Sequence, residues 1–255
     1  MVRDSEYHAL VERVVLVHGS VLGGAPTWSA QEALRERFEL VVVERPGFPP
    51  GPPVERVDFA EDAVLVAELL RPGDHLVGHS YGGVVSLLAA AHQPEVLASL
   101  TVVEPPATRV AAGNPAADAL AAGAAELWAT GPTHDPETFL NMFLVAVGSD
   151  FHPPSPFPPE LEQGARMLVR ERPPSEADIP LEALAAAPFP KLVVSGAHHP
   201  AFDAICDTLE SALGAERVAL RGNGHSVQRH PDFNAALADF VERAAEQRRA
   251  QASKD

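Results

Sequence analysis

The run Gly78-His79-Ser80-Tyr81-Gly82-Gly83 constrains the fold of this chain more than any other feature of its 255 residues. The apolar stretch 75–77 precedes it, and a helix-forming stretch from Val84 to Ala91 follows it. A Gly-x-Ser-x-Gly sequence between a strand and a helix is typical of a sharp turn that holds the serine hydroxyl out above the sheet. Glycines flank the serine because larger side chains would collide across so tight a turn. We therefore predict that Ser80 is a nucleophile at the edge of a sheet.

Short apolar stretches alternate with amphipathic ones along most of the chain. This order predicts right-handed β-α units and a parallel sheet with helices on both faces. The six predicted strands lie at 13–17, 40–43, 75–77, 100–103, 192–195 and 217–220. Between them, Thr27 is expected to cap the first helix and Asp58 the second. The residues from Gln247 onward are predicted to be a frayed polar tail.

Residues 105–188 break this alternation, because they contain no predicted strand. Helical patterns lie on both sides of the proline-rich run 152–159. An insertion of this size above the end of a strand is most simply a helical lid. We expect residues 1–104 and 189–255 to form the core domain and residues 105–188 to form a cap over it.

The charge and cysteine content exclude several classes of function. The chain carries 35 Asp and Glu against 19 Lys and Arg, a net charge of −16, so nucleic acid is not expected as a partner. Cys206 is the only cysteine, which rules out an internal disulfide. Polar residues interrupt the alanine-rich stretch 111–128, so no membrane span is expected. We predict a soluble, cytoplasmic protein, and its oligomeric state is left open.

Two further motifs, each directly after a predicted strand, accompany the serine turn. His18-Gly19 follows the first predicted strand, and Gly222-Asn223-Gly224-His225-Ser226 follows the last. Together with the serine motif they resemble the α/β-hydrolase superfamily over most of the chain outside 105–188. The resemblance implies a doubly wound α/β sheet with a helical cap. Only about a dozen residues precede the first strand, which leaves no room for the antiparallel hairpin usual in that superfamily, so we predict about six strands, essentially all parallel.

A serine hydroxyl needs a base to take its proton before it can act as a nucleophile. His225 is our candidate, because it lies in a glycine-flanked loop directly after the sixth strand and therefore at the same rim as Ser80. The rivals are His230, His198 and His199. His230 is expected at the start of a helix, where it has a capping or surface role.

The histidine in turn needs a carboxylate on its other ring nitrogen. The resemblance implies an aspartate three residues after Gly196, but His199 stands at that position. Glu104 ends the fourth strand, where some α/β-hydrolases carry their acid, and it is our first choice. Asp203 is the alternative acid, expected one turn into a helix, and an arrangement with no acid is the third possibility.

The oxyanion of an acyl-transfer intermediate needs two aimed donors. The amide of Tyr81 is one candidate, because it begins the helix after the serine. The resemblance implies that the second is the amide of Ser20 or Val21. We expect His18 to be a structural hydrogen-bonding residue and His79 to pack beside the serine turn.

Cofactor signals are weak in this chain. The adjacent pair His198-His199 points in different directions on a loop, and no carboxylate pattern supports it, so no metal site is predicted. The glycines between Gly19 and Gly24 lack the spacing of a nucleotide-binding loop. We therefore expect no cofactor.

These features predict a serine hydrolase that cleaves a carboxylic ester, thioester or lactone through an acyl-enzyme on Ser80. Trp128, Phe139 and Phe143 of the cap are candidates for lining a pocket for a small, partly apolar substrate, and they are equally candidates for the cap's own core. One alternative function is a lyase, cyclase or cofactor-free oxygenase that uses His225 as its base. Another is a non-catalytic receptor that binds a ligand.

Overall fold

The structure is a computed structural model that describes residues 11–253. Its strands form one six-stranded parallel sheet in the order β2-β1-β3-β4-β5-β6. The strands are β1 (Arg13–Val17), β2 (Glu39–Val43), β3 (Asp74–His79), β4 (Leu97–Val103), β5 (Lys191–Ser195) and β6 (Glu216–Ala219). The predicted six-stranded, all-parallel sheet is confirmed, and no antiparallel strand occurs among the described residues.

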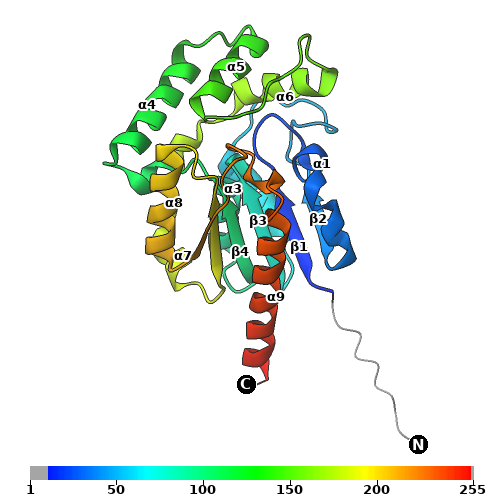
Figure 1. Ribbon diagram of the computed structural model, residues 1–255. Helices are drawn as coiled ribbons and strands as arrows, with labels where there is room; N and C mark the ends of the chain where they lie inside the picture. Colours follow the sequence, from blue (N-terminus) through cyan, green and yellow to red (C-terminus); the bar gives the residue numbers. More distant parts are fainter. Residues whose placement is uncertain (1–10, 254–255) are drawn as a thin grey trace, which may run out of the picture.

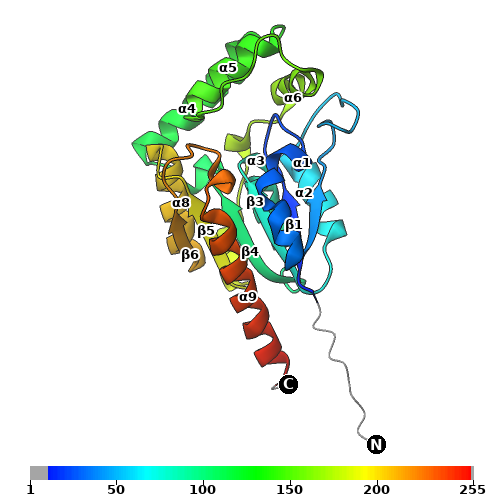
Figure 2. The ribbon, with the colours of Figure 1, turned by 45° about the vertical axis from the view of Figure 1, so that its right-hand side comes forward.

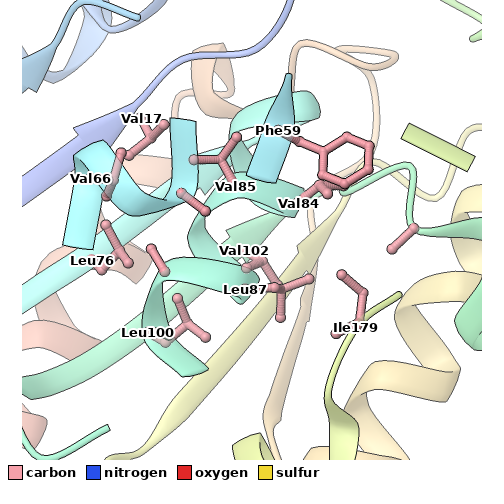
Figure 3. Packing of buried hydrophobic residues seen from close by; sticks show 14 of the residues in the cluster. Val17, Phe59, Val66, Leu76, Val84, Val85, Leu87, Leu100, Val102 and Ile179 are labelled. Carbon is pink, nitrogen blue, oxygen red and sulfur yellow. The ribbon is translucent and has the colours of Figure 1, made fainter. Parts of the chain in front are cut away.

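Helices cover both faces of this sheet (Figures 1 and 2). The first face packs against α2 (Phe59–Leu69), α3 (Tyr81–His92), α7 (Leu181–Ala186) and α8 (Pro200–Leu213). The second packs against the 3₁₀ helix η1 (Ser29–Glu36) and against α9 (Phe233–Ala252). Each face has its own buried apolar cluster, and Figure 3 shows part of the first. The two clusters are the core expected of a doubly wound parallel sheet.

The core is built from strands and helices that are apolar almost throughout. All seven residues of β4 are buried, and so are nine of the twelve residues of α3. In Figure 3, Leu87 of α3 lies beside Val102 of β4. Because β4 is wholly buried and α3 mostly so, the turn that joins β3 to α3 is held firmly at the end of the sheet.

The cap predicted at Asp58 is confirmed, since its side chain accepts a hydrogen bond from the amide of Ala60 at 2.8 Å. The cap predicted at Thr27 is wrong. A short helix α1 (Gly24–Thr27) ends there, and η1 follows without a side-chain cap. The buried residues of η1, Gln31 and Leu34, lie three positions apart, which is the repeat of a 3₁₀ helix.

The frayed tail predicted from Gln247 onward is also wrong, because α9 continues to Ala252. An ion pair holds this end of the helix: Nη1 of Arg249 lies 2.5 Å from Oε1 of Glu12. The contact joins residues at opposite ends of the chain, and no local pattern could have revealed it.

Between β4 and β5 the chain forms α4 (Pro115–Thr130), α5 (Pro136–Ala146) and α6 (Pro159–Arg170), with short 3₁₀ turns at Thr108–Ala111 and Pro174–Glu176, before α7 returns to the first face of the sheet. These three helices lie across the carboxyl ends of the strands, at the top of Figure 1. They share an apolar cluster that includes Leu127, Phe139, Leu140, Leu144, Leu161 and Leu168.

Candidate active site

Ser80 lies at the turn between β3 and α3 in a backbone conformation that few residues adopt. Its φ is 53° and its ψ is −123°, a left-handed φ that is strained for a residue with a side chain. A Cβ added to Gly78 would lie 2.3 Å from the carbonyl oxygen of Gly82, and one added to Gly82 would lie 2.3 Å from that of His18. These two contacts explain why glycine stands at both flanking positions.

His225 reaches Ser80 from the loop that follows β6. Its Nε2 lies 2.9 Å from Oγ of Ser80, within hydrogen-bond distance. The ring of Phe202 packs against the imidazole with their centres 4.6 Å apart. The imidazole is therefore held in line with the serine hydroxyl. The rival His230 lies elsewhere, where its Nδ1 accepts the amide hydrogen of Asp232 at 3.1 Å.

Glu104 follows β4 directly and is fully buried. Its Oε2 lies 2.9 Å from Nδ1 of His225, and its Oε1 accepts the amide hydrogen of Gly196 at 2.6 Å. Burial alone would raise the pKa of this carboxyl, but contacts with His198, His225 and the Gly196 amide outweigh burial and lower the pKa to about 2. A charged carboxylate thus meets the imidazole nitrogen that faces away from Ser80.

The two other residues considered for the acid position lie apart from His225. Asp203 is in the first turn of α8 with its side chain 39% exposed, and its nearest cation is Arg217 at 4.0 Å. It does not contact His225, because the first turn of the helix directs it towards solvent. His199 caps the same helix, with its Nδ1 accepting the amide hydrogen of Ala201 at 3.2 Å.

Backbone strain is concentrated around these side chains. Val21, Ser80, Glu104 and Ala197 are the four non-glycine residues in the described part of the chain with a left-handed φ, at 74°, 53°, 48° and 46°. Val21 and Ser80 both line the cleft described below. Glu104 is the residue beside His225, and Ala197 precedes His198 in the loop after β5. Strained residues cluster where the rest of the structure must hold a functional geometry.

The predicted oxyanion donors lie on either side of Ser80. Tyr81 is the first residue of α3, and the amides in the first turn of a helix have no partner within that helix. Ser20 and Val21 are in the loop after β1, and both residues line the cleft beside Ser80. The Oγ of Ser20 donates to Glu171 at 2.5 Å, which leaves its backbone amide as the group available for an oxyanion.

A buried ion network holds the loop after β1 in place, and sequence reasoning missed it. Arg45 is 1% exposed, and its guanidinium donates to Asp62 at 2.8 Å, to the carbonyl of Gly19 at 2.9 Å and to Glu171 at 3.3 Å. Burial raises the pKa of Glu171 to about 7, although Arg45 and the Ser20 hydroxyl both lower it. A signal was present, because Arg45 is a charged residue just after a predicted strand and therefore at the functional edge of the sheet.

The two histidines expected to be structural are confirmed in that role. Nε2 of His18 accepts the amide hydrogen of Arg45 at 3.0 Å, and its Nδ1 lies 2.8 Å from the carbonyl oxygen of Gly19. Burial, with some help from Arg45, lowers the pKa of His18 to about 3, so the ring is neutral. Nε2 of His79 lies 2.9 Å from the carbonyl oxygen of His225 and ties the loop of that residue to β3.

Two cavities meet at Ser80. The first, called the enclosed cavity below, is the smaller and less open of the two, with a volume of about 40 Å³ and a mostly apolar wall whose polar residues include Ser20, Ser80, Thr108, Glu171 and Ser175. The second is an open, more polar cleft of about 340 Å³. The enclosed cavity has Leu127, Trp128, Phe143 and Phe202 in its wall. The cleft has Leu144, Asn223, His225 and Gln228 in its wall.

The structure separates the three aromatic residues that were candidates for the substrate pocket. Trp128 lines the enclosed cavity, and Phe143 lines both spaces. Phe139 lines neither of them. Its side chain is completely buried in the cluster between α4, α5 and α6, where its ring meets that of Trp128 edge-on at 5.3 Å. The structure thus places Phe139 in the core of the helical segment, which is the second of the two roles considered for it.

Glu104, His198 and His225 form a cluster that could also hold a metal ion, since one ligand atom from each lies within 4.8 Å of the others. A cation there would compete with the hydrogen bond that His225 makes to Glu104, because both would use the same carboxylate oxygen. The absence of a metal site from the function of this chain stays a prediction. The contact between Glu104 and His198 was not foreseen from the sequence.

Comparison with known proteins assigns this arrangement to a family. A family model described as "Alpha/beta hydrolase family" matches residues 14–237. The chain belongs to the α/β-hydrolase family. The matched part of this α/β-hydrolase spans about a third of the length of its curated relatives. The pimeloyl-[acyl-carrier protein] methyl ester esterase of Aeromonas hydrophila is 36% identical over 92 residues, which are 35% of this chain and 36% of that protein. The corresponding esterase of Aeromonas salmonicida matches to the same extent.

Solved structures resemble this α/β-hydrolase over nearly its whole length. NosK from Streptomyces actuosus superposes with a TM-score of 0.58 at 24% sequence identity. The match covers 92% of this chain and 99% of the NosK chain. Carboxylesterase CesB from Bacillus subtilis superposes with a TM-score of 0.62 at 16% sequence identity. That match covers 91% of this chain and 84% of the CesB chain. Identities this low show the shared fold alone. Within residues 11–253, none of the helices of this α/β-hydrolase combines the length and apolar character that crossing a bilayer requires.

Proposed function

We propose that this α/β-hydrolase is a serine hydrolase that cleaves a carboxylic ester, thioester or lactone through an acyl-enzyme on Ser80. The observation that carries the proposal is the chain of two 2.9 Å contacts that runs from Oγ of Ser80 through the imidazole of His225 to Glu104. A serine, an imidazole and a carboxylate in this order are the parts needed to activate a hydroxyl for attack on an acyl carbon. The names of the Aeromonas relatives, both methyl ester esterases, support an ester as the bond.

In the first half of the reaction, Oγ of Ser80 attacks the acyl carbon while its proton passes to Nε2 of His225. The negative charge that develops on the acyl oxygen is bound by the amide of Tyr81 and by that of Ser20 or Val21. His225 then gives its proton to the leaving oxygen or sulfur. In the second half, water takes the place of the leaving group, and the same steps in reverse release the acid and restore Ser80.

The two cavities suggest which part of the substrate lies where. His225 must protonate the leaving atom, so the leaving group lies on the side of Ser80 that His225 lines, which is the open cleft. The acyl group then enters the enclosed apolar cavity. This cavity is much smaller than the cleft, about 40 Å³ against about 340 Å³, which favours a small acyl group. We infer a substrate with a short apolar acyl group and a larger, polar alcohol or thiol.

We assign residues 1–104 and 189–255 to the catalytic core and residues 105–188 to a cap, although α7 within that range packs against the sheet. Helices α4 and α5 of this segment supply Leu127, Trp128 and Phe143 to the wall of the enclosed cavity. Water is excluded from the acyl side of the site by these apolar side chains, which strengthens the electrostatic contacts there.

The lyase, cyclase or oxygenase alternative rested on the missing acid in the loop after β5. The position of Glu104 beside His225 supplies an acid from another strand and weakens that argument. Ser80 is held in a strained backbone conformation within 2.9 Å of an imidazole nitrogen. Ligand binding alone does not require such strain, so this geometry argues against a non-catalytic receptor. Both alternatives are separated from the proposal by the Ser80 variant discussed below.

A series of esters tests the proposed function and its orientation together. We expect kcat/KM for p-nitrophenyl esters to fall steadily from acetate and butyrate to octanoate and laurate. Butyrate esters of polar alcohols larger than methanol should be cleaved at least as fast as methyl butyrate. The reverse order, with long acyl chains preferred and larger alcohols rejected, would place the acyl group in the cleft and overturn the assignment.

A matched pair of variants makes the test specific to one cavity. Leu127 lines the enclosed cavity and Leu144 lines the cleft, and both are largely buried in the same apolar cluster. Leu127→Ala is expected to improve the octanoate-to-butyrate ratio of kcat/KM by about tenfold, in line with the value of a few methylenes in an apolar pocket. Leu144→Ala should leave that ratio unchanged. An equal gain in both variants would show a general loosening instead.

A further inference from the structure

His198 is a second imidazole in contact with the buried acid. Its Nδ1 lies 3.3 Å from Oε2 of Glu104, the same oxygen that meets His225 at 2.9 Å. Its Nε2 lies 3.2 Å from the carbonyl oxygen of Val147, just after α5. The contact with Glu104 is close enough for an ion pair, although the ring is not aligned for a straight hydrogen bond. One carboxylate oxygen is thus shared by two imidazoles.

The partners of His198 determine which protonation state fits. A carbonyl oxygen can only accept, so Nε2 carries a hydrogen. The carboxylate of Glu104 also only accepts, and a bare lone pair on Nδ1 would face an anion at 3.3 Å. Both nitrogens must therefore carry hydrogen, which is the imidazolium form. The ring also stacks on Phe202 with the centres 5.8 Å apart, a contact that suits a cation.

The carboxylate of Glu104 needs a positive partner because it is completely buried. Among residues 11–253, no Lys or Arg nitrogen lies within ion-pair distance of it, and its two ion-pair contacts are His198 and His225. His225 must be neutral to take the proton of Ser80. His198 is therefore the group left to balance the charge.

We propose that His198 is a positioning residue whose imidazolium balances Glu104 and thereby keeps His225 in its neutral, proton-accepting form. This inference rests on the proposed function only for the role of His225 as a base. The charge on His198 itself follows from the contacts of the ring with Glu104 and Val147.

The other groups that face His198 are few. Glu104 and His225 face it from the ends of β4 and β6, and His199 and Asp203 from the start of α8. The neighbouring helical segment presents the carbonyl of Val147. Burial lowers the pKa of His198, but Glu104 outweighs burial and the net shift is upward. The pKa of His199 is lowered, by burial first and then by His198, so His199 is not a competing cation.

The consequence for the pH profile has a definite sign. A cation whose ring centre lies 6.0 Å from that of His225 makes protonation of His225 less favourable. Removing that cation is expected to move the acidic limb of kcat/KM to higher pH. We expect His198→Gln to shift that limb by about one pH unit. At high pH, where His198 has lost its own proton, the variant and the wild type should converge in rate.

Two further variants isolate the charge. His198→Lys restores a cation and should return the acidic limb towards its wild-type position. His199→Asn removes the neighbouring imidazole but keeps a residue suited to capping α8, and it should leave the limb unshifted. A loss of rate by the same factor at every pH in His198→Gln, or equal shifts in the Gln and Lys variants, would overturn the proposal.

A direct measurement applies even if the variants fold poorly or no ester is turned over. Wild-type protein labelled with ¹⁵N-histidine should show, at pH 7, an imidazolium with both ring nitrogens protonated that is absent from His198→Gln and is thereby assigned to His198. A neutral ring at that position would refute the inference. Because this spectrum needs no substrate, failure of the proposed function would be seen separately, as turnover that persists in Ser80→Ala.

Discussion

Replacing Ser80 by alanine is expected to lower kcat/KM for p-nitrophenyl butyrate by roughly 10⁴-fold or more. The loss is large because the variant has no atom that can form the acyl-enzyme, and the oxyanion donors and the aligned imidazole cannot replace it. Folding should be little affected, since alanine tolerates the φ of 53° about as well as serine does. Steady-state kinetics and the thermal unfolding midpoint check the two halves of this expectation.

The same variant decides between the classes of function. A lyase or oxygenase that uses His225 as a base would keep part of its turnover without Ser80, because no acyl-enzyme is on its path. A receptor would bind ligand in both forms and consume it in neither. Ser29→Ala, at an exposed serine on η1 away from the two cavities, is the control and should behave as the wild type. Substantial ester turnover by Ser80→Ala would remove the acyl-enzyme from the account.

The second large effect is expected at Glu104. Glu104→Gln should lower kcat by about 10³- to 10⁴-fold with little change in KM, because a carboxamide can turn its NH₂ towards Nδ1 of His225 and stabilise the wrong tautomer. In that tautomer Nε2 carries the hydrogen and cannot accept the proton of Ser80. The substituted side chain is nearly the same size, so the cavity and the fold are left intact.

Asp203→Asn is the matched control for this prediction. Asp203 lies close in sequence to the position where the resemblance implies the acid. Its side chain is nevertheless 39% exposed and lies near Arg217 instead of His225. We expect its kcat to stay within about twofold of the wild type, as for surface substitutions in general. If Asp203→Asn loses orders of magnitude in turnover while Glu104→Gln does not, the assignment of the acid is wrong.

The sheet and its serine turn could be predicted because their signals are local. The strands are apolar runs bounded by helical patterns, and the turn at Ser80 needs glycines at fixed positions that the sequence shows directly. The position of His225 followed from the rule that loops after parallel strands gather at one edge. These are properties of segments a few residues long, so a single sequence contains them.

The features that escaped prediction depend on contacts between distant segments. Glu104 was predicted to meet His225, 121 residues away, but its contact with His198, 94 residues away, was not predicted. The order of the sheet places β4 between β3 and β5, and only this order brings the three side chains together. The pairing of Arg45 with Glu171 depends on tertiary packing in the same way.

The most direct test of the account is the site and rate of labelling by a fluorophosphonate, which reports a serine activated by a nearby base. Mass spectrometry of the wild type should find one phosphonyl group per chain, on the peptide that contains Ser80. The label should be absent from Ser80→Ala and should form far more slowly in His225→Ala. No labelling of the folded wild type, or labelling that proceeds equally fast without His225, would contradict the claim that the imidazole activates the hydroxyl.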